Sequence, residues 1–194
     1  MKTSRLVPLL LALVALAGCS VATSPDHVDP PQTPIAKTST PTAAVSVPLI
    51  TQEQVDKLSK PAIVGYVKAR SQILRDGGRG AQRLRPWATS AQLREDRMIF
   101  NSYRLYRAHL TGRVRTSQFT IESFTQSAGE SPRVTVTACE DYTHLRQVDR
   151  WGSIGRAFKG RDNNRMMYIL TTSATNPSRL VVADIPYLKP NDCS

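Results

Sequence analysis

The chain has 194 residues and carries 26 lysines and arginines against 15 aspartates and glutamates, a formal net charge of +11. This length accommodates one domain and a tail, and no apolar run after residue 17 approaches the roughly 20 residues that a membrane-spanning helix needs. The positive balance favours negatively charged partners over basic ones.

The N-terminus has the parts of a secretory signal peptide. Lys2 and Arg5 precede an apolar run that extends from Leu6 to Ala17, and residues 16–19 read Leu-Ala-Gly-Cys. These four residues resemble the lipobox of bacterial lipoproteins, in which the cysteine receives a diacylglycerol and becomes the mature N-terminus. The resemblance implies a signal peptide over 1–18, lipidation of Cys19 and anchoring at the extracytoplasmic face of the cell membrane. The alternative is an ordinary signal peptide with an accidental cysteine.

Residues 19–50 are expected to form a disordered tether. Residues 20–50 carry six prolines among Ser, Thr and Ala and have no aromatic residue. Such a segment buries too little apolar surface to offset its ordering entropy. A single domain is therefore expected over 51–194.

Two helices are predicted next. Thr51 and Gln54 form a capping-box pattern, and apolar residues at helical spacing continue to Gly77-Gly78, with Pro61 expected to kink or divide the helix. The second helix is predicted to start after Thr89 and end at Gly112. Its expected apolar side comprises Leu93, Ile99, Phe100, Tyr103, Tyr106 and Leu110.

The helical spacing of apolar residues ends at Gly112. The segments 114–126, 133–142, 165–173 and 179–186 are rich in β-branched and aromatic residues and read as strands, and 146–160 reads as a short hairpin arm. Helices followed by antiparallel strands predict an α+β domain with the N-terminal helices packed on a curved sheet.

The stretch from Tyr103 to Cys193 resembles actinobacterial lipoproteins that have a nuclear transport factor 2-like cone fold. The carrying segments are Ala108–Gly112 as a helix end, Val134–Asp141, Val148-Asp149 with Gly152, and the C-terminal cysteine. The resemblance implies a cone-like sheet. Small lipoproteins of this kind also occur in phage and prophage genomes, which suggests superinfection exclusion as an alternative function.

Cys139 and Cys193 remain once Cys19 is assigned to the lipid. Outside the cytoplasm disulfides persist, and two cysteines allow one intramolecular pairing. The alternative is two buried free thiols. The spacing gives little support to a zinc site, so no metal and no cofactor are expected.

Enzymes with the cone fold use an Asp or an Asp/His pair for proton transfer, and the candidates here are Asp141, Asp149, His109 and His144. Strand alternation places Asp141 opposite the apolar face of Val134, Val136 and Ala138, which favours a turn-forming or salt-bridging role. His109 is explained by a helix C-terminus and His144 by a solvated loop. We therefore expect a non-enzymatic protein, with a pocket enzyme of the cyclase or isomerase type as an alternative.

Arginines are concentrated between residues 75 and 115, where there are ten of them and only three acids. A basic stripe raises affinity for polyanions, and solvation of an exposed helix face is the alternative. The candidate polyanion-binding residues are Arg79, Arg83, Arg85, Arg94, Arg97, Arg104 and Arg107. The expected partners are the membrane, through the lipid, and an anionic envelope polymer or an envelope protein, without specific nucleic-acid recognition.

Overall fold

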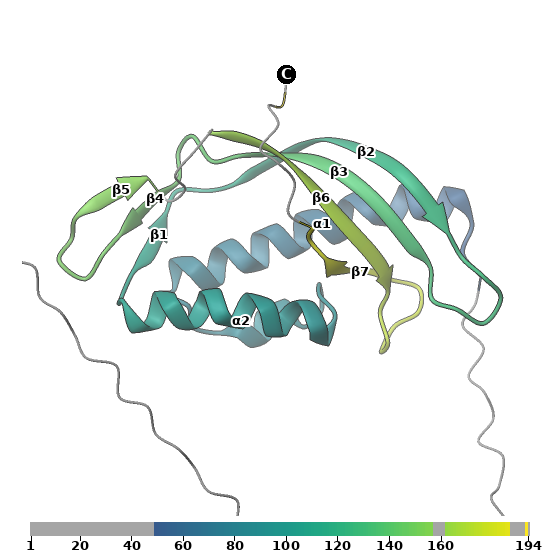
Figure 1. Ribbon diagram of the computed structural model, residues 1–194, viewed down its shortest axis with the longest axis horizontal. Helices are drawn as coiled ribbons and strands as arrows, with labels where there is room; N and C mark the ends of the chain where they lie inside the picture. The colour runs from purple at the N-terminus through teal and green to yellow at the C-terminus, as the bar shows by residue number, and fades with distance from the viewer. Residues whose placement is uncertain (1–48, 157–161, 187–192, 194) are drawn as a thin grey trace, which may run out of the picture. The chain divides into compact units, whose positions relative to one another are not determined.

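The computed structural model describes residues 49–156, 162–186 and 193 (Figure 1). These residues belong to one compact unit that spans 43–194. The predicted signal segment 1–18, Cys19 and nearly all of the predicted tether lie outside the described residues. Ile50, the last residue of that tether, packs against the core, and its N–H donates to Gln126 Oε1 at 3.0 Å. The packed domain therefore includes Ile50 and starts before Thr51.

The described domain is α+β, as predicted, with two α-helices and two antiparallel sheets. The helices are α1 (Gln52–Arg75) and α2 (Ser90–Leu105), with a 3-10 turn η1 (Ala81–Leu84) between them. One sheet has the order β2-β3-β6-β7: β2 (Arg115–Thr125), β3 (Arg133–Asp141), β6 (Asn163–Thr172) and β7 (Leu180–Asp184). The other has the order β1-β4-β5: β1 (His109–Thr111), β4 (Arg146–Val148) and β5 (Ile154–Arg156). Figure 1 shows both helices on the same side of the four-stranded sheet.

Helix α1 begins with the predicted capping box. Thr51 Oγ1 accepts the Gln54 N–H at 3.2 Å, and Gln54 Oε1 accepts the Thr51 N–H at 2.9 Å. Pro61 was expected to kink or divide the helix, and division is wrong, because the single 24-residue helix α1 includes Pro61. An interior proline costs one backbone hydrogen bond and a clash with the carbonyl four residues earlier, about 3 kcal/mol, and burial of apolar residues on both sides of Pro61 offsets this cost. In the described ranges, neither helix is long and apolar enough to cross a membrane.

Helix α2 ends earlier than the predicted Gly112. Arg107 has φ 50°, the Ala108 N–H donates to the Tyr103 carbonyl at 2.9 Å, and the Arg107 N–H donates to the Arg104 carbonyl at 3.3 Å. This pair of bonds is a Schellman motif, which turns the chain out of the helix. Residues 109–111 therefore form β1 and pair with β4.

Two consequences follow for the predicted apolar side of this helix. Leu110 is buried through strand pairing instead of helix packing. Tyr106, predicted as a core residue, is 66% exposed because it lies at the end of the helix, beyond the sheet-facing surface.

Strand β3 lies in the middle of the core. Val134, Val136 and Ala138 alternate along it and are almost fully buried with the helices and with Leu170 of β6. The opposite face of β3 carries Cys139, which is joined to Cys193 by a disulfide with a Cα–Cα separation of 5.8 Å. The C-terminal cysteine is thereby attached to the centre of the four-stranded sheet.

Candidate functional site

An open hollow of about 970 Å³ lies beside the C-terminal ends of α1 and α2. The two ends approach closely, since a Cβ on Gly78 would lie 2.0 Å from the Phe100 carbonyl oxygen. Gly78 has φ 79°, so only glycine both adopts this conformation and permits the contact. The lining residues are Arg75, Asp76, Gly77, Arg79, Arg83, Arg104, Arg107, Ala108 and His109.

The hollow carries a positive charge. Five arginines less the one carboxylate of Asp76 leave four positive charges when His109 is counted as neutral. Each helix C-terminus contributes about −0.5 charge, which lowers the total to roughly three. Arg83 is paired with Asp76 and Arg75 donates to the Gly112 carbonyl at 3.4 Å. The remaining arginines, Arg79, Arg104 and Arg107, are exposed and form no ion pair with any described residue.

The hollow gathers four of the seven arginines predicted to bind polyanions. Arg79, Arg83, Arg104 and Arg107 line it, together with Arg75 and His109, which the prediction did not assign to this role. Arg85, Arg94 and Arg97 are exposed but lie outside its lining. Arg75 and Arg104 both lie in the last turn of a helix. Only for Arg75 does the sequence predict this position, because the second helix was predicted to continue to Gly112.

Arg107 lies in a backbone conformation that costs energy. Both helices end in the same motif, and α1 places Gly77 at the left-handed position where α2 places Arg107. A left-handed residue with a Cβ is disfavoured by about 1–2 kcal/mol, and such strain tends to occur at functional positions. The chain thus carries a charged residue in the hollow at a position that favours glycine or asparagine.

A second pocket, of about 380 Å³, lies between the two helices and the four-stranded sheet. It contains two buried carboxylates, Asp96 on α2 and Glu140 on β3, which are 2% and 5% exposed. Apolar residues of α2 and the strands, including Met98, Ile99 and Met166, complete its lining.

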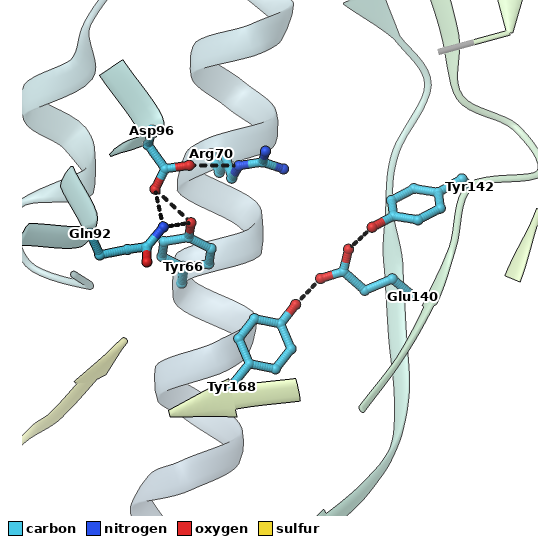
Figure 2. Close-up of polar contacts among 7 residues, drawn as sticks. All are labelled: Tyr66, Arg70, Gln92, Asp96, Glu140, Tyr142 and Tyr168. Carbon is cyan, nitrogen blue, oxygen red and sulfur yellow. Dashed lines mark hydrogen bonds and ion pairs between the residues drawn. The ribbon is translucent and has the colours of Figure 1, made fainter. Parts of the chain in front are cut away.

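Asp96 receives three hydrogen bonds (Figure 2). Tyr66 Oη donates to it at 2.6 Å, Arg70 Nε at 2.9 Å and Gln92 Nε2 at 3.2 Å. Gln92 Oε1 is buried and has no partner among the described residues. An amide turned the other way would place this oxygen against the Asp96 carboxylate, so the repulsion between them favours the observed orientation.

Glu140 receives hydrogen bonds from two tyrosines, Tyr142 and Tyr168 (Figure 2). The Tyr168 ring also meets the Tyr66 ring edge to face, at 6.4 Å between centroids, so it lies between the two carboxylate groups. Burial raises the pKa of Tyr66, Tyr142 and Tyr168, and the charge of Glu140 raises the last two further. The phenols therefore stay protonated and act as donors at neutral pH.

The proton-transfer candidates predicted from the sequence lie outside this pocket. Asp141 accepts the Thr143 N–H at 2.8 Å, which is the turn-forming role expected of it. Hydrogen bonds from the side chain and the backbone of Thr143 lower the pKa of Asp141. Asp149 likewise holds a turn, accepting the Trp151 N–H at 2.8 Å. His144 is exposed in a loop, and His109 lies in β1 instead of at the predicted helix end.

Glu140 was not among the candidates predicted from the sequence, although strand alternation indicates where its side chain lies. The alternation that points Asp141 away from the core places Glu140 on the same face as Ala138, toward the helices. Asp96 and Arg70 had no comparable signal, because their contact joins two helices across 26 residues of sequence. Both carboxylates are occupied by donors from the protein itself, so the cluster is built to be hydrogen-bonded internally.

No protein-family model matches this chain, and no curated protein matches it. Among solved structures, the chain is similar to the crystal structure of the intermembrane space region of the chloroplast protein ARC6. The TM-score is 0.49 and the identity 13%, over 73% of this chain and 98% of the other. A likeness of this degree carries no inference about function.

Proposed function

We propose that the protein is a surface-anchored, non-enzymatic lipoprotein whose α+β domain binds an anionic component of the cell envelope. In this proposal Cys19 carries the lipid, the segment from Cys19 to the start of the packed domain at Ile50 forms the tether, and the domain has the cone-like fold of actinobacterial or phage lipoproteins. The observation that carries the binding role is the hollow with five arginines and one acid.

The chemistry of the hollow suits a phosphate-bearing ligand. Guanidinium groups donate two parallel hydrogen bonds to phosphate oxygens, and such charge-assisted bonds are stronger than neutral ones. Arg79, Arg104 and Arg107 are exposed and form no ion pair with another described residue, so their donors are accessible to a ligand. Repeating phosphates, as in teichoic-type polymers or a leaflet of anionic lipid, would match several arginines at once.

A second candidate function is small-molecule chemistry in the pocket that holds Asp96 and Glu140. The presence of two buried carboxylates in one pocket favours it, because proton transfer needs a partly desolvated acid or base. Against it, each carboxylate accepts hydrogen bonds from two or more protein donors. An experiment can separate the two functions, because removing arginines from the hollow would impair binding of an anionic ligand there but not chemistry in the pocket that holds Asp96 and Glu140.

Polyphosphate binding should depend on the arginines of the hollow. We expect Arg79→Gln combined with Arg104→Gln to weaken binding of long-chain inorganic polyphosphate at least about tenfold, since each charge-assisted hydrogen bond contributes about 1.5 kcal/mol or more. The matched control, Arg94→Gln with Arg97→Gln, removes the same charge from exposed positions of α2 outside the hollow and should weaken binding much less. Titration calorimetry at low and moderate salt measures both. Equal losses of affinity in the two variants would show that binding depends on net charge alone and that the hollow is not the binding site.

Anchoring should depend on Cys19. Replacing Cys19 with alanine removes the thiol that would carry the diacylglycerol, and stable attachment requires buried acyl chains. We expect the variant to leave the detergent phase and to accumulate in soluble or uncleaved form, as followed by immunoblotting after phase partitioning. Unchanged partitioning would exclude the lipoprotein assignment.

A further inference from the structure

Large apolar side chains are exposed at the end of α2 and around the turn between β4 and β5. Leu105 is 75% exposed, Tyr106 66%, Trp151 74% and Ile154 71%. We refer to these four residues as the apolar tip.

Strand register places the β4–β5 turn, which carries Trp151, and Ile154 next to the start of β1, into which the end of α2 leads. His109, three residues after Tyr106, pairs with Val148 of β4, and Val148 also pairs with Ile154 of β5. Trp151 lies three residues beyond Val148, in the connecting turn. Figure 1 agrees, since the end of α2 and the β4–β5 turn lie at the same end of the domain.

The apolar tip is presented by ordered backbone. Asp149 Oδ1 accepts the N–H groups of Trp151 at 2.8 Å and of Ser153 at 2.9 Å, which fixes the turn. Tyr103 of α2 donates to Gln147 of β4 at 3.1 Å and links the helix to the hairpin. These bonds fix the backbone that carries the apolar side chains, so docking does not have to order that backbone.

Arginines border the apolar tip. Arg104 and Arg107 flank Leu105 and Tyr106, and all four are exposed. The guanidinium of Arg150, also exposed, lies 4.0 Å from the centre of the Trp151 ring. The acid nearest in sequence, Asp149, is engaged by the turn. Apolar and aromatic side chains with a rim of arginine match the interface of an anionic bilayer, where rings sit at headgroup level and guanidinium groups reach phosphates.

We propose that the apolar tip docks into the headgroup region of an anionic phospholipid bilayer, with Leu105, Tyr106, Trp151 and Ile154 inserted and Arg104, Arg107 and Arg150 on the phosphates. The inference extends the proposed function, because it rests on the domain being held at a membrane, and it names a contact that the hollow does not make. Docking orients the domain so that the neighbouring hollow, which shares Arg104 and Arg107, lies close to the lipid surface.

Tryptophan fluorescence tests the proposal in the full chain. The protein has two tryptophans, Trp151 and Trp87. Trp87 packs against Gly65 of α1 and lies under Arg179 at 3.9 Å, away from the apolar tip. The full-length protein is incorporated into vesicles that contain brominated phosphatidylcholine, with or without phosphatidylglycerol. The difference between wild type and Trp151→Phe isolates the emission of Trp151, and Trp87→Phe gives it directly.

We expect phosphatidylglycerol vesicles to quench the emission of Trp151 by half or more, while zwitterionic vesicles quench it much less and that of Trp87 is unchanged in both. Leu105→Ser with Ile154→Ser, or Arg150→Gln alone, should reduce the quenching. Val64→Ser, a partly exposed site on α1, serves as the apolar control and should not.

Unquenched Trp151 in anionic vesicles would overturn the proposal and leave a protein partner as the occupant of the apolar tip. Equal quenching of Trp151 in anionic and zwitterionic vesicles would contradict the proposed role of Arg104, Arg107 and Arg150 in binding phosphates. Polyphosphate binding in solution does not require insertion of the apolar side chains, although Arg104 and Arg107 serve both contacts. A protein that binds polyphosphate without quenching, or the reverse, therefore separates this inference from the proposed function.

Discussion

Replacing Asp96 with alanine should lower the free energy of unfolding by about 3–5 kcal/mol, because it leaves the buried hydroxyl of Tyr66 and one of the two N–H groups of the Gln92 amide without an acceptor and removes the partner of Arg70. Asp96 is 2% exposed and accepts all three of these hydrogen bonds. Breaking a buried pair from one side costs more than the pair contributes, since the remaining groups lose both water and partner. Urea unfolding followed by circular dichroism measures the loss.

Asp76 provides the matched control for Asp96. It also pairs with an arginine, Arg83, but both side chains are substantially exposed to water, which solvates either group once the other is removed. Asp76→Ala should therefore change stability little. If the two variants lose the same stability, burial is not what gives the Asp96 cluster its effect, and the hydrogen-bonded arrangement in Figure 2 would need revision.

The domain should lose stability steeply above about pH 10. Tyr66, Tyr142 and Tyr168 have pKa values raised in the folded protein, so the folded state keeps these protons where the unfolded chain releases them near pH 10. Stability from a raised pKa is fully present below the unfolded value and is lost as pH rises toward the folded value. Each tyrosine contributes about 1.4 kcal/mol per pH unit in that range, and three contribute about 4.

Urea unfolding between pH 9 and 11 measures this slope, and absorbance of ionised phenol at 295 nm shows when the tyrosines titrate. Tyr168→Phe should reduce the slope by about one third, since one linked proton is removed. Tyr106 is the natural control: it is exposed, and Tyr106→Phe should leave the slope unchanged. Titration of all tyrosines near pH 10 without unfolding would show that Glu140 and Asp96 are not surrounded by buried phenols.

Elements defined by neighbouring residues were predictable from the sequence. The capping box of Thr51 and Gln54 is a local hydrogen-bonding pattern, and the structure places the start of α1 there. The strands around 115–125, 133–141 and 163–172 follow from segments rich in β-branched and aromatic residues, which favour a half-buried sheet. The end of α2 was not predictable in this way. Arg107 adopts a left-handed conformation that ends the helix, and no glycine marks this position in the sequence. The spacing of apolar residues therefore predicts a helix that continues to Gly112.

The candidate sites also combine features that the sequence predicts with features that depend on the tertiary structure. The sequence by itself determined the surplus of arginines between residues 75 and 115, because charge is a property of composition, and it also determined that Glu140 shares a strand face with Ala138. Only the tertiary structure decided which arginines meet in one hollow, because that depends on two helix ends brought together by the close contact at Gly78. It also decided that Asp96 meets Tyr66 and Arg70, and that the β4–β5 turn lies at the same end of the domain as the end of α2. These contacts join residues far apart in the chain, and their partners are chosen by the packing of whole elements, which no local pattern encodes.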